Sequence, residues 1–450
     1  MGRLFGTDGV RGIAGTELNY SLAINIGRAA AMVLTETTNH RPRIVIGTDT
    51  RASADMLESA LATGFCSVGA DVMMLGVIPT PAVAYLVQKY EADAGVMISA
   101  SHNPMEYNGI KLFSNEGYKL SDKLEEKIEA IVLDKTEKPP VCTGGAIGRI
   151  THVRTAAKDY VRHLVGLSTV DCSGLRFAID CANGSASVTA PLLFAALGAD
   201  CEILSAAPDG TNINRDCGST HLKSLQDFVV KKHLDFGLAF DGDADRCLAV
   251  DENGAILDGD KLIAIFAHEM KKNKTLTDDT AVVTILSNLG FFHFAQQNDI
   301  HIETTKVGDR YVLESMRAHN YAIGGEQSGH IIFLHDSTTG DGELTAIRFI
   351  SAIKENGIKA SALASIMQTY PQVMVNVPVT PEDKEKLCTN NTVQKAIDEA
   401  EKSLSGDGRI LLRASGTEPL IRVMVEGENL DLIEKLANDV ANVVKAQMEA

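Results

Sequence analysis

Short apolar segments alternate with helical stretches over most of the chain, and this alternation restricts the fold more than any other feature. The segments 43–47, 71–75 and 95–99 have the composition and length of strands. The segments 55–70 and 80–90, which follow the first two of them, have the periodicity of helices. Short apolar strands separated by helices indicate a mostly parallel sheet that is covered on both faces. The sequence therefore predicts doubly wound α/β domains.

The same alternation occurs in three successive blocks and then changes. A stretch rich in proline and glycine at 139–148 is the first candidate linker, and the second block includes a predicted helix at 219–233. After a half-buried strand at 373–379, the last segments form a small α+β pattern. We predict three doubly wound α/β domains with mixed or parallel sheets, followed by a small C-terminal α+β domain. The predicted bounds are 1–150, 151–252, 253–367 and 368–450.

The charge and hydropathy of the chain exclude two classes of partner. The 42 Lys and Arg residues and 59 Asp and Glu residues give a formal net charge of −17 at pH 7. Such an acidic protein is poorly suited to bind a nucleic-acid backbone or an anionic membrane, although a basic pocket for a small phosphorylated ligand is still allowed. No apolar run approaches the ~18 residues that a membrane span needs. The eight cysteines form no C-x-x-C pair, and the N-terminus has no apolar signal core, so we expect a cytoplasmic protein.

The strongest single motif is a run of three alternating aspartates, Asp241, Asp243 and Asp245, directly after a predicted strand. Carboxylates spaced in this way, with small residues between them, can converge on one hard cation, and Mg²⁺ is usual in phosphoryl-transfer sites. Three other interpretations stay open. An EF-hand loop would need glycine where Arg246 stands, a haloacid-dehalogenase-type phosphatase would use Asp241 as its nucleophile, and an acidic surface turn would bind nothing.

A second motif, Ser101 followed by His102, Asn103 and Pro104, lies at the end of another predicted strand. A serine hydroxyl at a strand end beside a histidine can act as an activated nucleophile. No G-x-S-x-G elbow is present, which disfavours an α/β-hydrolase. The same residues are also typical of a turn whose side chains cap the backbone, so this segment alone leaves both interpretations open.

Three further loops combine glycine with polar side chains. The loop at 413–422 contains two arginines and small hydroxyl residues that suit a phosphate, although a polar hairpin would look the same. The loop at 324–330 carries Glu, Gln and Ser side chains that suit sugar hydroxyls, and alone it is a weak signal. The loop at 5–12 is either close to a phosphate or a tight turn. Ligands of open α/β sheets bind at the carboxyl ends of strands, so the placement of these loops suggests a site.

Taken together, four of these motifs resemble the α-D-phosphohexomutase superfamily. They are Ser-His-Asn-Pro, Asp-Gly-Asp-Ala-Asp-Arg, Gly-Glu-Gln-Ser-Gly-His and Arg-Ala-Ser-Gly-Thr-Glu-Pro, in this order over the whole chain. The segments 3–12 and 307–310 and the side chain of Gln327 resemble the phosphoglucosamine mutase branch. The phosphomannomutase/phosphoglucomutase branch, which uses the same mechanism, is the alternative. A catalytically silent sugar-phosphate-binding homologue should have lost Ser101 or one of the aspartates, and the chain keeps all of them.

The resemblance implies an isomerase with four domains around a central active-site cleft. It would interconvert glucosamine 6-phosphate and glucosamine 1-phosphate through a phosphoserine enzyme and glucosamine 1,6-bisphosphate, which is intermediate and activator. The product leads toward UDP-N-acetylglucosamine and peptidoglycan precursors. The implied partner is a small phosphosugar, with no nucleic acid and no membrane. The oligomeric state is left open, a homodimer being one option.

The resemblance also implies a role for each matching residue. Ser101 would carry the phosphoryl group, and one Mg²⁺ would be held by a phosphoserine oxygen with Asp241, Asp243 and Asp245. The implied substrate contacts are Arg246, Glu326, Ser328, Arg413, Ser415, Gly416, Thr417 and Arg422. The residues implied in proton transfer are Arg11, Lys111 and His330, and His330 is equally compatible with a structural place beside the sugar loop.

Overall fold

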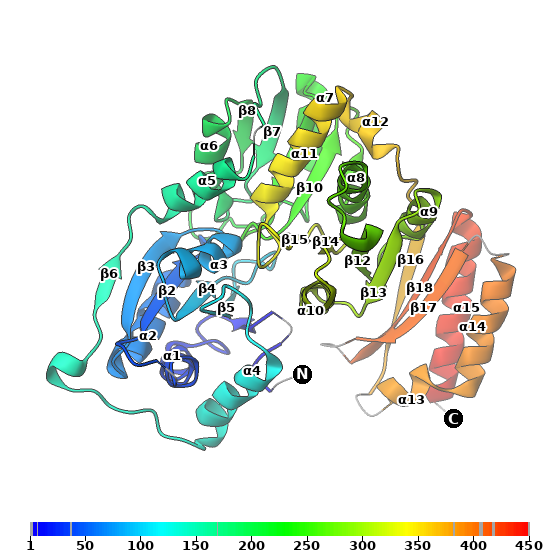
Figure 1. Cartoon of the computed structure of the whole chain (residues 1–450). Helices are drawn as coiled ribbons and strands as arrows, with labels where there is room; N and C mark the ends of the chain where they lie inside the picture. The colour runs from blue at the N-terminus through cyan, green and yellow to red at the C-terminus, as the bar shows by residue number, and fades with distance from the viewer. Residues whose placement is uncertain are drawn as a thin grey trace. The chain divides into compact units, whose positions relative to one another are not determined.

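The computed structural model describes residues 3–6, 8–36, 38–168, 170–380, 383–404, 408–415 and 419–448. The chain forms two compact units (Figure 1). Unit 1 comprises Met1–Leu286 and Ile300–Ile366, and unit 2 comprises Ser287–Asp299 and Met367–Ala450. Within the described ranges, no helix is both long enough and apolar enough to cross a membrane.

The first sheet of unit 1 has six strands in the order β1-β5-β4-β2-β3-β6. Its elements are β1 (Val10–Ile13), α1 (Tyr20–Leu34), β2 (Arg43–Thr48), α2 (Ala54–Ser67), β3 (Asp71–Val77), α3 (Thr80–Lys89), β4 (Ala94–Ile98), β5 (Tyr107–Ser114), α4 (Asp122–Glu129) with a π-helical turn (Ala130–Asp134), a 3₁₀ turn (Gly144–Ala146) and β6 (Ile150–His152). Helices α1 and α2 bury side chains such as Leu61 and Phe65 against one face. On the other face, Gly47 and Gly95 leave room for Val83 of α3.

The second sheet has the order β11-β10-β9-β7-β8. Its elements are α5 (Ala156–Gly166), β7 (Arg176–Asp180), α6 (Ala186–Ala196), β8 (Asp200–Leu204), α7 (Lys223–Lys232), β9 (Phe236–Phe240), β10 (Cys247–Asp251) and β11 (Ile256–Leu257). Leu225 and Val229 of α7 pack on one face. The stacked rings of Phe177 and Phe236, with centroids 4.8 Å apart, lie on the other face.

The third sheet has the order β13-β12-β14-β15. Its elements are α8 (Gly259–Lys272), a 3₁₀ turn (Thr277–Asp279), β12 (Thr280–Thr284), β13 (His301–Thr305), α10 (Asp309–His319), β14 (Ile323–Gly325), β15 (Ile331–Phe333), α11 (Gly342–Asn356) and α12 (Ala360–Ala364). Val312 and Met316 of α10 pack against Val282 of the sheet. The ring of Phe266 in α8 contacts that of Phe333, with centroids 5.3 Å apart.

All three sheets of unit 1 share one plan, in which parallel strands are followed by an antiparallel hairpin. The hairpins are β4–β5, β9–β10 and β14–β15. The sheets are therefore mixed, and the expectation of mostly parallel strands is too simple. The doubly wound α/β fold itself is confirmed. Each hairpin turn leaves the carboxyl end of a strand that also has a parallel neighbour, which is where open α/β sheets bind ligands.

Unit 2 holds the α+β domain that the sequence predicts. Its elements are α9 (Leu289–Gln297), β16 (Gln372–Pro378), α13 (Lys384–Cys388), α14 (Asn391–Ser403), β17 (Gly408–Ala414), β18 (Leu420–Gly427) and α15 (Leu430–Met448). The sheet is antiparallel in the order β16-β18-β17. Helices α14 and α15 cover one of its faces (Figure 1) and bury Val393 and Val440 against Val423.

Two helices of unit 1 differ from the sequence-based expectation. Helix α1 has no expected counterpart, because its alanine-rich segment buries Ala29, Ala30 and Ala31 in succession and so lacks a clear helical period. Helix α7 begins at Lys223 instead of residue 219. The amides just before it are already bonded to the second sheet, because Ser219 N donates to Phe240 O at 2.8 Å. Tertiary hydrogen bonds thus delay the start of this helix.

Candidate active site

Ser101 lies in the turn of the β4–β5 hairpin and is almost fully buried. Its backbone is left-handed, with a φ of 53°, which is a strained conformation for a residue with a side chain. Its amide donates to Ser99 Oγ at 2.9 Å, and its hydroxyl donates to Asp241 Oδ2 at 2.5 Å. His102 Nδ1 lies 3.2 Å from the same hydroxyl oxygen. The hydroxyl of Ser101 therefore faces the aspartate loop of the second sheet.

A buried arginine, Arg51, fixes the backbone of this turn. Its guanidinium donates to the carbonyl oxygens of Ser101 at 3.0 Å and Asn103 at 2.8 Å, and it pairs with Asp49 at 2.8 Å. Asn214 Nδ2 also donates to the carbonyl of Ser101, at 2.9 Å. Sequence reasoning missed Arg51 and Asn214. Their only local signal is the Asp-x-Arg spacing directly after β2, which is not specific.

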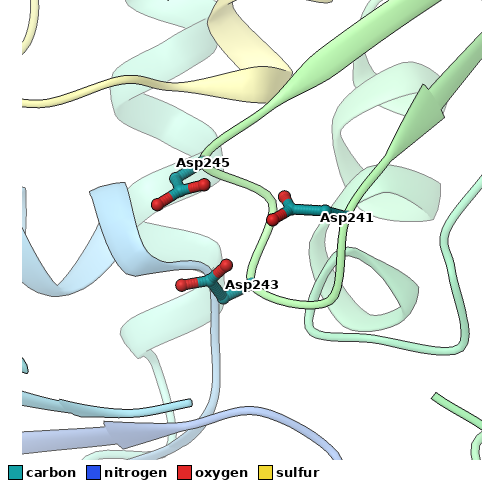
Figure 2. Close-up of side chains that lie close together, drawn as sticks. All are labelled: Asp241, Asp243 and Asp245. Atoms are coloured by element: carbon teal, nitrogen blue, oxygen red, sulfur yellow. The ribbon is translucent and has the colours of Figure 1, made fainter. Parts of the chain in front are cut away.

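The three aspartates of the β9–β10 turn converge in space. Figure 2 shows the carboxylates of Asp241, Asp243 and Asp245 on one loop, and each offers an oxygen within 4.8 Å of the others. All three are buried, and the Oδ1 atoms of Asp243 and Asp245 have no hydrogen-bond partner among the described residues. Burial, and then the charges of Asp245 and Asp243, raise the pKa of Asp241 to about 8. Buried carboxylates with unused oxygens fit a hard divalent cation, which prefers oxygen ligands.

Three helix N-termini hold the backbone of the aspartate loop. Three successive carbonyl oxygens each accept a hydrogen bond from an amide at the start of a helix, and the three helices come from different α/β blocks. The pairs are Ser185 N to Gly242 O at α6 (2.8 Å), Thr80 N to Asp243 O at α3 (2.9 Å) and Gly342 N to Ala244 O at α11 (3.0 Å). The positive ends of these helices therefore meet at an acidic loop. The hydroxyl of Thr80 also donates to Asp243 Oδ2, a contact that sequence reasoning missed.

Of the residues expected near proton transfer, Lys111 joins this loop to the N-terminal segment, and Arg11 pairs within that segment. Lys111 Nζ is 2.7 Å from Asp243 Oδ2, 3.2 Å from Asp245 Oδ2 and 3.0 Å from Asp8 Oδ2. Burial lowers the pKa of Lys111, but these carboxylates more than reverse the effect and hold the pKa well above its ordinary value. Arg11 pairs with Asp8. Lys111 is therefore a fixed cation in the described structure.

Arg246 contacts the histidine that lies beside the serine. Its Nη1 donates to His102 Nδ1 at 3.2 Å. Burial, and then the positive charge of Arg246, lower the pKa of His102 to about 4, so this ring is neutral near pH 7. The carboxylates of Asp241, Asp245 and Glu326 raise the pKa of Arg246 against the effect of its burial. Arg246 therefore supplies a permanent positive charge close to the Ser101 hydroxyl.

The β14–β15 turn contains the predicted sugar loop. Glu326 Oε1 accepts a hydrogen bond from Gly308 N at 3.0 Å, and burial raises the pKa of Glu326. Gln327 Nε2 donates to Asp258 Oδ2 at 3.2 Å, so this side chain supports the turn. The hydroxyl of Ser328 is buried and has no hydrogen-bond partner within the described part of the chain. That hydroxyl is therefore left for a ligand to bind.

His330 is buried at the end of the same turn. Its Nε2 accepts a hydrogen bond from Gly340 N at 3.1 Å, and its Nδ1 lies 3.7 Å from Asp245 Oδ1. Burial lowers the pKa of His330, and the Asp245 carboxylate more than reverses this, so the pKa lies above its usual value. The amide of Gly340 nevertheless keeps a proton off Nε2. This geometry favours a ring that is held in place over one that shuttles protons.

The predicted phosphate loop belongs to unit 2. Arg413 of β17 and Arg422 of β18 are direct cross-strand partners, so two guanidinium groups share one hairpin. Burial, and then the charge of Arg422, lower the pKa of Arg413. Ser415 is buried just beyond β17, whereas Gly416 and Thr417 lie outside the described residues. Two like charges directly opposite each other are destabilising, and an anion would relieve the repulsion.

Unit 1 therefore brings most of the predicted site residues into one connected cluster, through the contacts described above. Those residues are Ser101, Arg11, Lys111, Asp241, Asp243, Asp245, Arg246, Glu326 and His330, and Ser328 lies in the same turn as Glu326. The arginine hairpin is a separate feature of unit 2. A buried serine hydroxyl beside three carboxylates and several fixed cations can carry out metal-assisted phosphoryl transfer.

Family models for the four domains of one enzyme family match the chain in order. They describe phosphoglucomutase/phosphomannomutase alpha/beta/alpha domain I at residues 2–139, domain II at 158–254, domain III at 258–370 and the C-terminal domain at 374–443. Curated relatives include the phosphoglucosamine mutases of Acetivibrio thermocellus, 53% identical, and of Caldanaerobacter subterraneus, 54% identical. Each match spans 448 residues and covers 100% of both chains.

Solved structures show the same fold at lower identity. A phosphoglucomutase/phosphomannomutase family protein from Burkholderia thailandensis superimposes with a TM-score of 0.81 at 22% identity, covering 98% of this chain and 97% of the other. The N-acetylphosphoglucosamine mutase of Aspergillus fumigatus, solved with GlcNAc-6P and magnesium, has a TM-score of 0.70 at 18% identity. That match covers 99% of this chain and 96% of the other.

Proposed function

The chain belongs to the phosphoglucomutase/phosphomannomutase family, and we propose from this premise that it is an isomerase that interconverts glucosamine 6-phosphate and glucosamine 1-phosphate. The observation that carries the proposal is the hydrogen bond from the buried Ser101 hydroxyl to the aspartate cluster. The sugar is indicated by relatives more than half identical over their whole length, which are phosphoglucosamine mutases.

We propose that Ser101 carries the phosphoryl group and transfers it to the free hydroxyl of the sugar phosphate. As the bond from Ser101 Oγ to phosphorus breaks, a bond from the sugar oxygen to phosphorus forms. Overall, the proton of the sugar hydroxyl ends on Ser101 Oγ, which becomes a free hydroxyl again. The resulting glucosamine 1,6-bisphosphate turns around in the site and returns its other phosphoryl group to Ser101. The fixed backbone of the serine turn, held by Arg51, keeps Oγ in place during both transfers.

Asp241, Asp243 and Asp245 would hold one Mg²⁺ together with an oxygen of the phosphoserine. The ion would neutralise charge that develops on the transferring group. The Oδ1 atoms of Asp243 and Asp245, which have no hydrogen-bond partner among the described residues, support this assignment. The helix N-termini and the Thr80 hydroxyl keep the loop in shape before any ligand binds.

Arg11, Lys111 and Arg246 would stabilise the charge of the transferring phosphoryl group. Arg11, Lys111 and His330 stay candidates for proton transfer, and His330 is the least suited because Gly340 occupies its Nε2. Glu326 and Ser328 would bind sugar hydroxyls. The distal phosphate would be bound by Arg413, Ser415, Gly416, Thr417 and Arg422. We also propose that the chain divides into four domains at the bounds predicted from the sequence, which are 1–150, 151–252, 253–367 and 368–450.

Two measurements on the purified protein test the function. Intact mass before and after phosphatase treatment shows whether a phosphoryl group is present, and a phosphopeptide map shows whether Ser101 carries it. Turnover is then compared for the 6-phosphates of glucosamine, mannose and glucose. Preferred conversion of the glucosamine ester supports the proposal. A preference for mannose or glucose would move the enzyme to the sibling phosphomannomutase/phosphoglucomutase activity.

A further inference from the structure

One lysine, Lys119, joins two carboxylates that lie far apart in the sequence. Its Nζ pairs with Asp8 Oδ1 of the N-terminal segment and with Asp309 Oδ2 at the start of α10. The two aspartates lie in the segments 3–12 and 307–310, which resemble the phosphoglucosamine mutase branch, and neither aspartate has a role in the chemistry proposed above. Only 9% of the Lys119 side chain is exposed. Burial lowers its pKa and the two carboxylates more than reverse this, so Lys119 is charged.

Asp8 connects Lys119 to the proposed reaction centre. Its carboxylate contacts three cations, because Lys111 Nζ lies 3.0 Å from Oδ2 and Arg11 pairs with the same oxygen. Asp8 is thus shared between Lys119 and two groups proposed to touch the transferring phosphoryl group. Any change in the charge on Lys119 alters how strongly Asp8 holds Arg11 and Lys111, since all three cations compete for one carboxylate.

Asp309 connects Lys119 to the sugar loop. It is the first residue of α10, and the preceding amide, Gly308 N, donates to Glu326 Oε1 at 3.0 Å. Asp309 Oδ2 also lies 3.6 Å from His330 Nε2. The chain of contacts therefore runs from the reaction centre through Asp8, Lys119 and Asp309 to the backbone that positions Glu326.

We propose that Lys119 is a positioning residue, which acts through Asp8 on Arg11 and Lys111 and through Asp309 on the sugar loop. The inference rests on the proposed function, because it assumes that the loop and the two cations serve one reaction. It also connects the segments 3–12 and 307–310, because Asp8 in the first and Asp309 in the second both pair with Lys119.

The neighbouring residue Arg310 supplies a matched control. It also spans from α10 to the first sheet, where its Nη2 lies 2.8 Å from Glu125 Oε2 and its Nη1 pairs with Asp122. Both partners belong to α4, and neither is an ion-pair partner of Lys119, Arg11 or Lys111 among the described residues. The Glu125 carboxylate is nevertheless near enough to Lys119 and Asp8 to be affected by their charges. Removing Arg310 therefore breaks a salt bridge between the same two parts of the chain while leaving the ion pairs of Asp8 and Asp309 with Lys119 in place.

The test compares Lys119→Met with Arg310→Met in the full-length enzyme. We expect Lys119→Met to lower kcat by roughly ten- to hundredfold, the loss that follows when a charge-assisted hydrogen bond is removed. Lys119→Arg, which keeps the charge, should be more active than Lys119→Met. Arg310→Met should lower the melting temperature about as much as Lys119→Met and keep most of the wild-type kcat. Equal losses of kcat in the two Met variants would overturn the proposal. They would mean that any salt bridge between these two parts of the chain has the same effect on kcat as the contacts of Lys119 with Asp8 and Asp309.

A double-variant cycle adds a readout that a general loss of stability would not move. In Lys119→Met the carboxylate of Asp309 loses its partner cation, so adding Asp309→Asn should not lower kcat further. Independent, additive losses in the double variant would overturn the proposal. If Lys119→Met does not fold, Lys119→Arg and Asp309→Asn still test it, since wild-type kcat in both would contradict a positioning role.

These outcomes are separable from a failure of the proposed function. The kcat of each variant is compared with the wild-type kcat on whichever hexose phosphate the wild-type enzyme converts. The double-variant cycle can therefore still be evaluated if the enzyme prefers another sugar. Release of the phosphoryl group from the phosphorylated enzyme on mixing with that sugar phosphate, followed by intact mass, isolates the transfer step. A wild-type enzyme that transfers to no hexose phosphate would contradict both the function and the inference.

Discussion

The two charged regions of the chain are built in opposite ways. In unit 1, carboxylates and cations lie next to one another. A single lysine, Lys111, contacts the three carboxylates of Asp8, Asp243 and Asp245. In unit 2, Arg413 and Arg422 face each other across one hairpin, and the charge of Arg422 contributes to lowering the pKa of Arg413. The first region is already organised by its own opposite charges. The second places two like charges opposite each other, and a bound anion would lower the repulsion between them.

This difference in charge arrangement predicts that the two regions contribute to different kinetic parameters. Preorganised groups that need no rearrangement during a reaction lower its barrier, which suits the cluster of unit 1. Groups of like charge that bind a non-reacting phosphate contribute mainly to affinity, which suits the hairpin of unit 2. Changes in the cluster should therefore alter kcat and metal binding, whereas changes in the hairpin should alter KM.

The largest effect is expected for Ser101→Ala. The variant lacks the oxygen that would carry the phosphoryl group, so mutase turnover should fall below detection even with bisphosphate supplied. The loss of one hydrogen bond should change the free energy of unfolding by about 0.5–1.5 kcal/mol. Turnover of glucosamine 6-phosphate and thermal melting are the measurements. The control Ser351→Ala removes a hydroxyl that donates to Ile347 O within α11 and should stay active. Near-wild-type turnover in a folded Ser101→Ala would show that Ser101 does not carry the phosphoryl group.

The next largest effect is expected for Asp243→Asn. The change removes one of three converging charges while preserving the shape that contacts Thr80 and Lys111. Mg²⁺ affinity should fall by at least about 10–100-fold, the loss seen even when groups behind the metal ligands are removed. Isothermal titration with Mg²⁺ measures it directly. The control Asp251→Asn changes a buried aspartate that accepts turn amides, and it should keep the wild-type affinity. Unchanged binding in Asp243→Asn would mean that the triplet is an acidic turn.

The sequence predicts the parts of both regions that are local in the chain. Asp241, Asp243 and Asp245 are recognisable because three carboxylates follow one strand, and Ser101 is recognisable beside His102. Arg51, Thr80 and Lys119 are not, because their partners lie 50 to 190 residues away. A lysine or threonine that contacts a distant carboxylate has no local period or spacing. The same limit explains the hairpins, since strand direction depends on tertiary pairing that a run of apolar residues does not encode.

Arg422→Ala tests the other side of the comparison. The guanidinium is proposed to bind the phosphate that does not react, so KM should rise more than kcat falls, and phosphorylation of Ser101 should be unaffected. The loss in kcat/KM should be about 1.5–3 kcal/mol if only the charged hydrogen bonds are lost. Ligand-induced compaction in small-angle scattering should also decrease. The control Arg409→Ala alters an arginine that instead pairs with Glu426. Wild-type kcat/KM together with full compaction in Arg422→Ala would show that the loop is only a hairpin turn.

The smallest expected effect is a dependence on pH that separates the two regions. In the metal-free, unphosphorylated enzyme the pKa of Asp241 is about 8, raised by burial and then by its neighbouring carboxylates. Below that pH, Mg²⁺ must displace a proton from Asp241, so apparent affinity should rise about fivefold from pH 7 to 8 and about twofold more above pH 8 before it levels off.

The folded-state pKa of Asp241 lies above its usual value of 3.8, so the folded state binds the proton more tightly than the unfolded chain. Without metal, this group therefore lowers stability as pH rises from about 4 to 8, and Mg²⁺ should offset that loss. In the hairpin, burial and then the charge of Arg422 lower the pKa of Arg413, but a guanidinium stays protonated in proteins. We therefore expect the KM ratio of Arg422→Ala to wild type to stay constant from pH 7 to 9. Titrations in two buffers of different ionisation enthalpy count the protons released with Mg²⁺. An affinity for Mg²⁺ that does not change over this range would show that the aspartates are ionised before the ion arrives, and the contrast between the two regions would then be one of geometry alone.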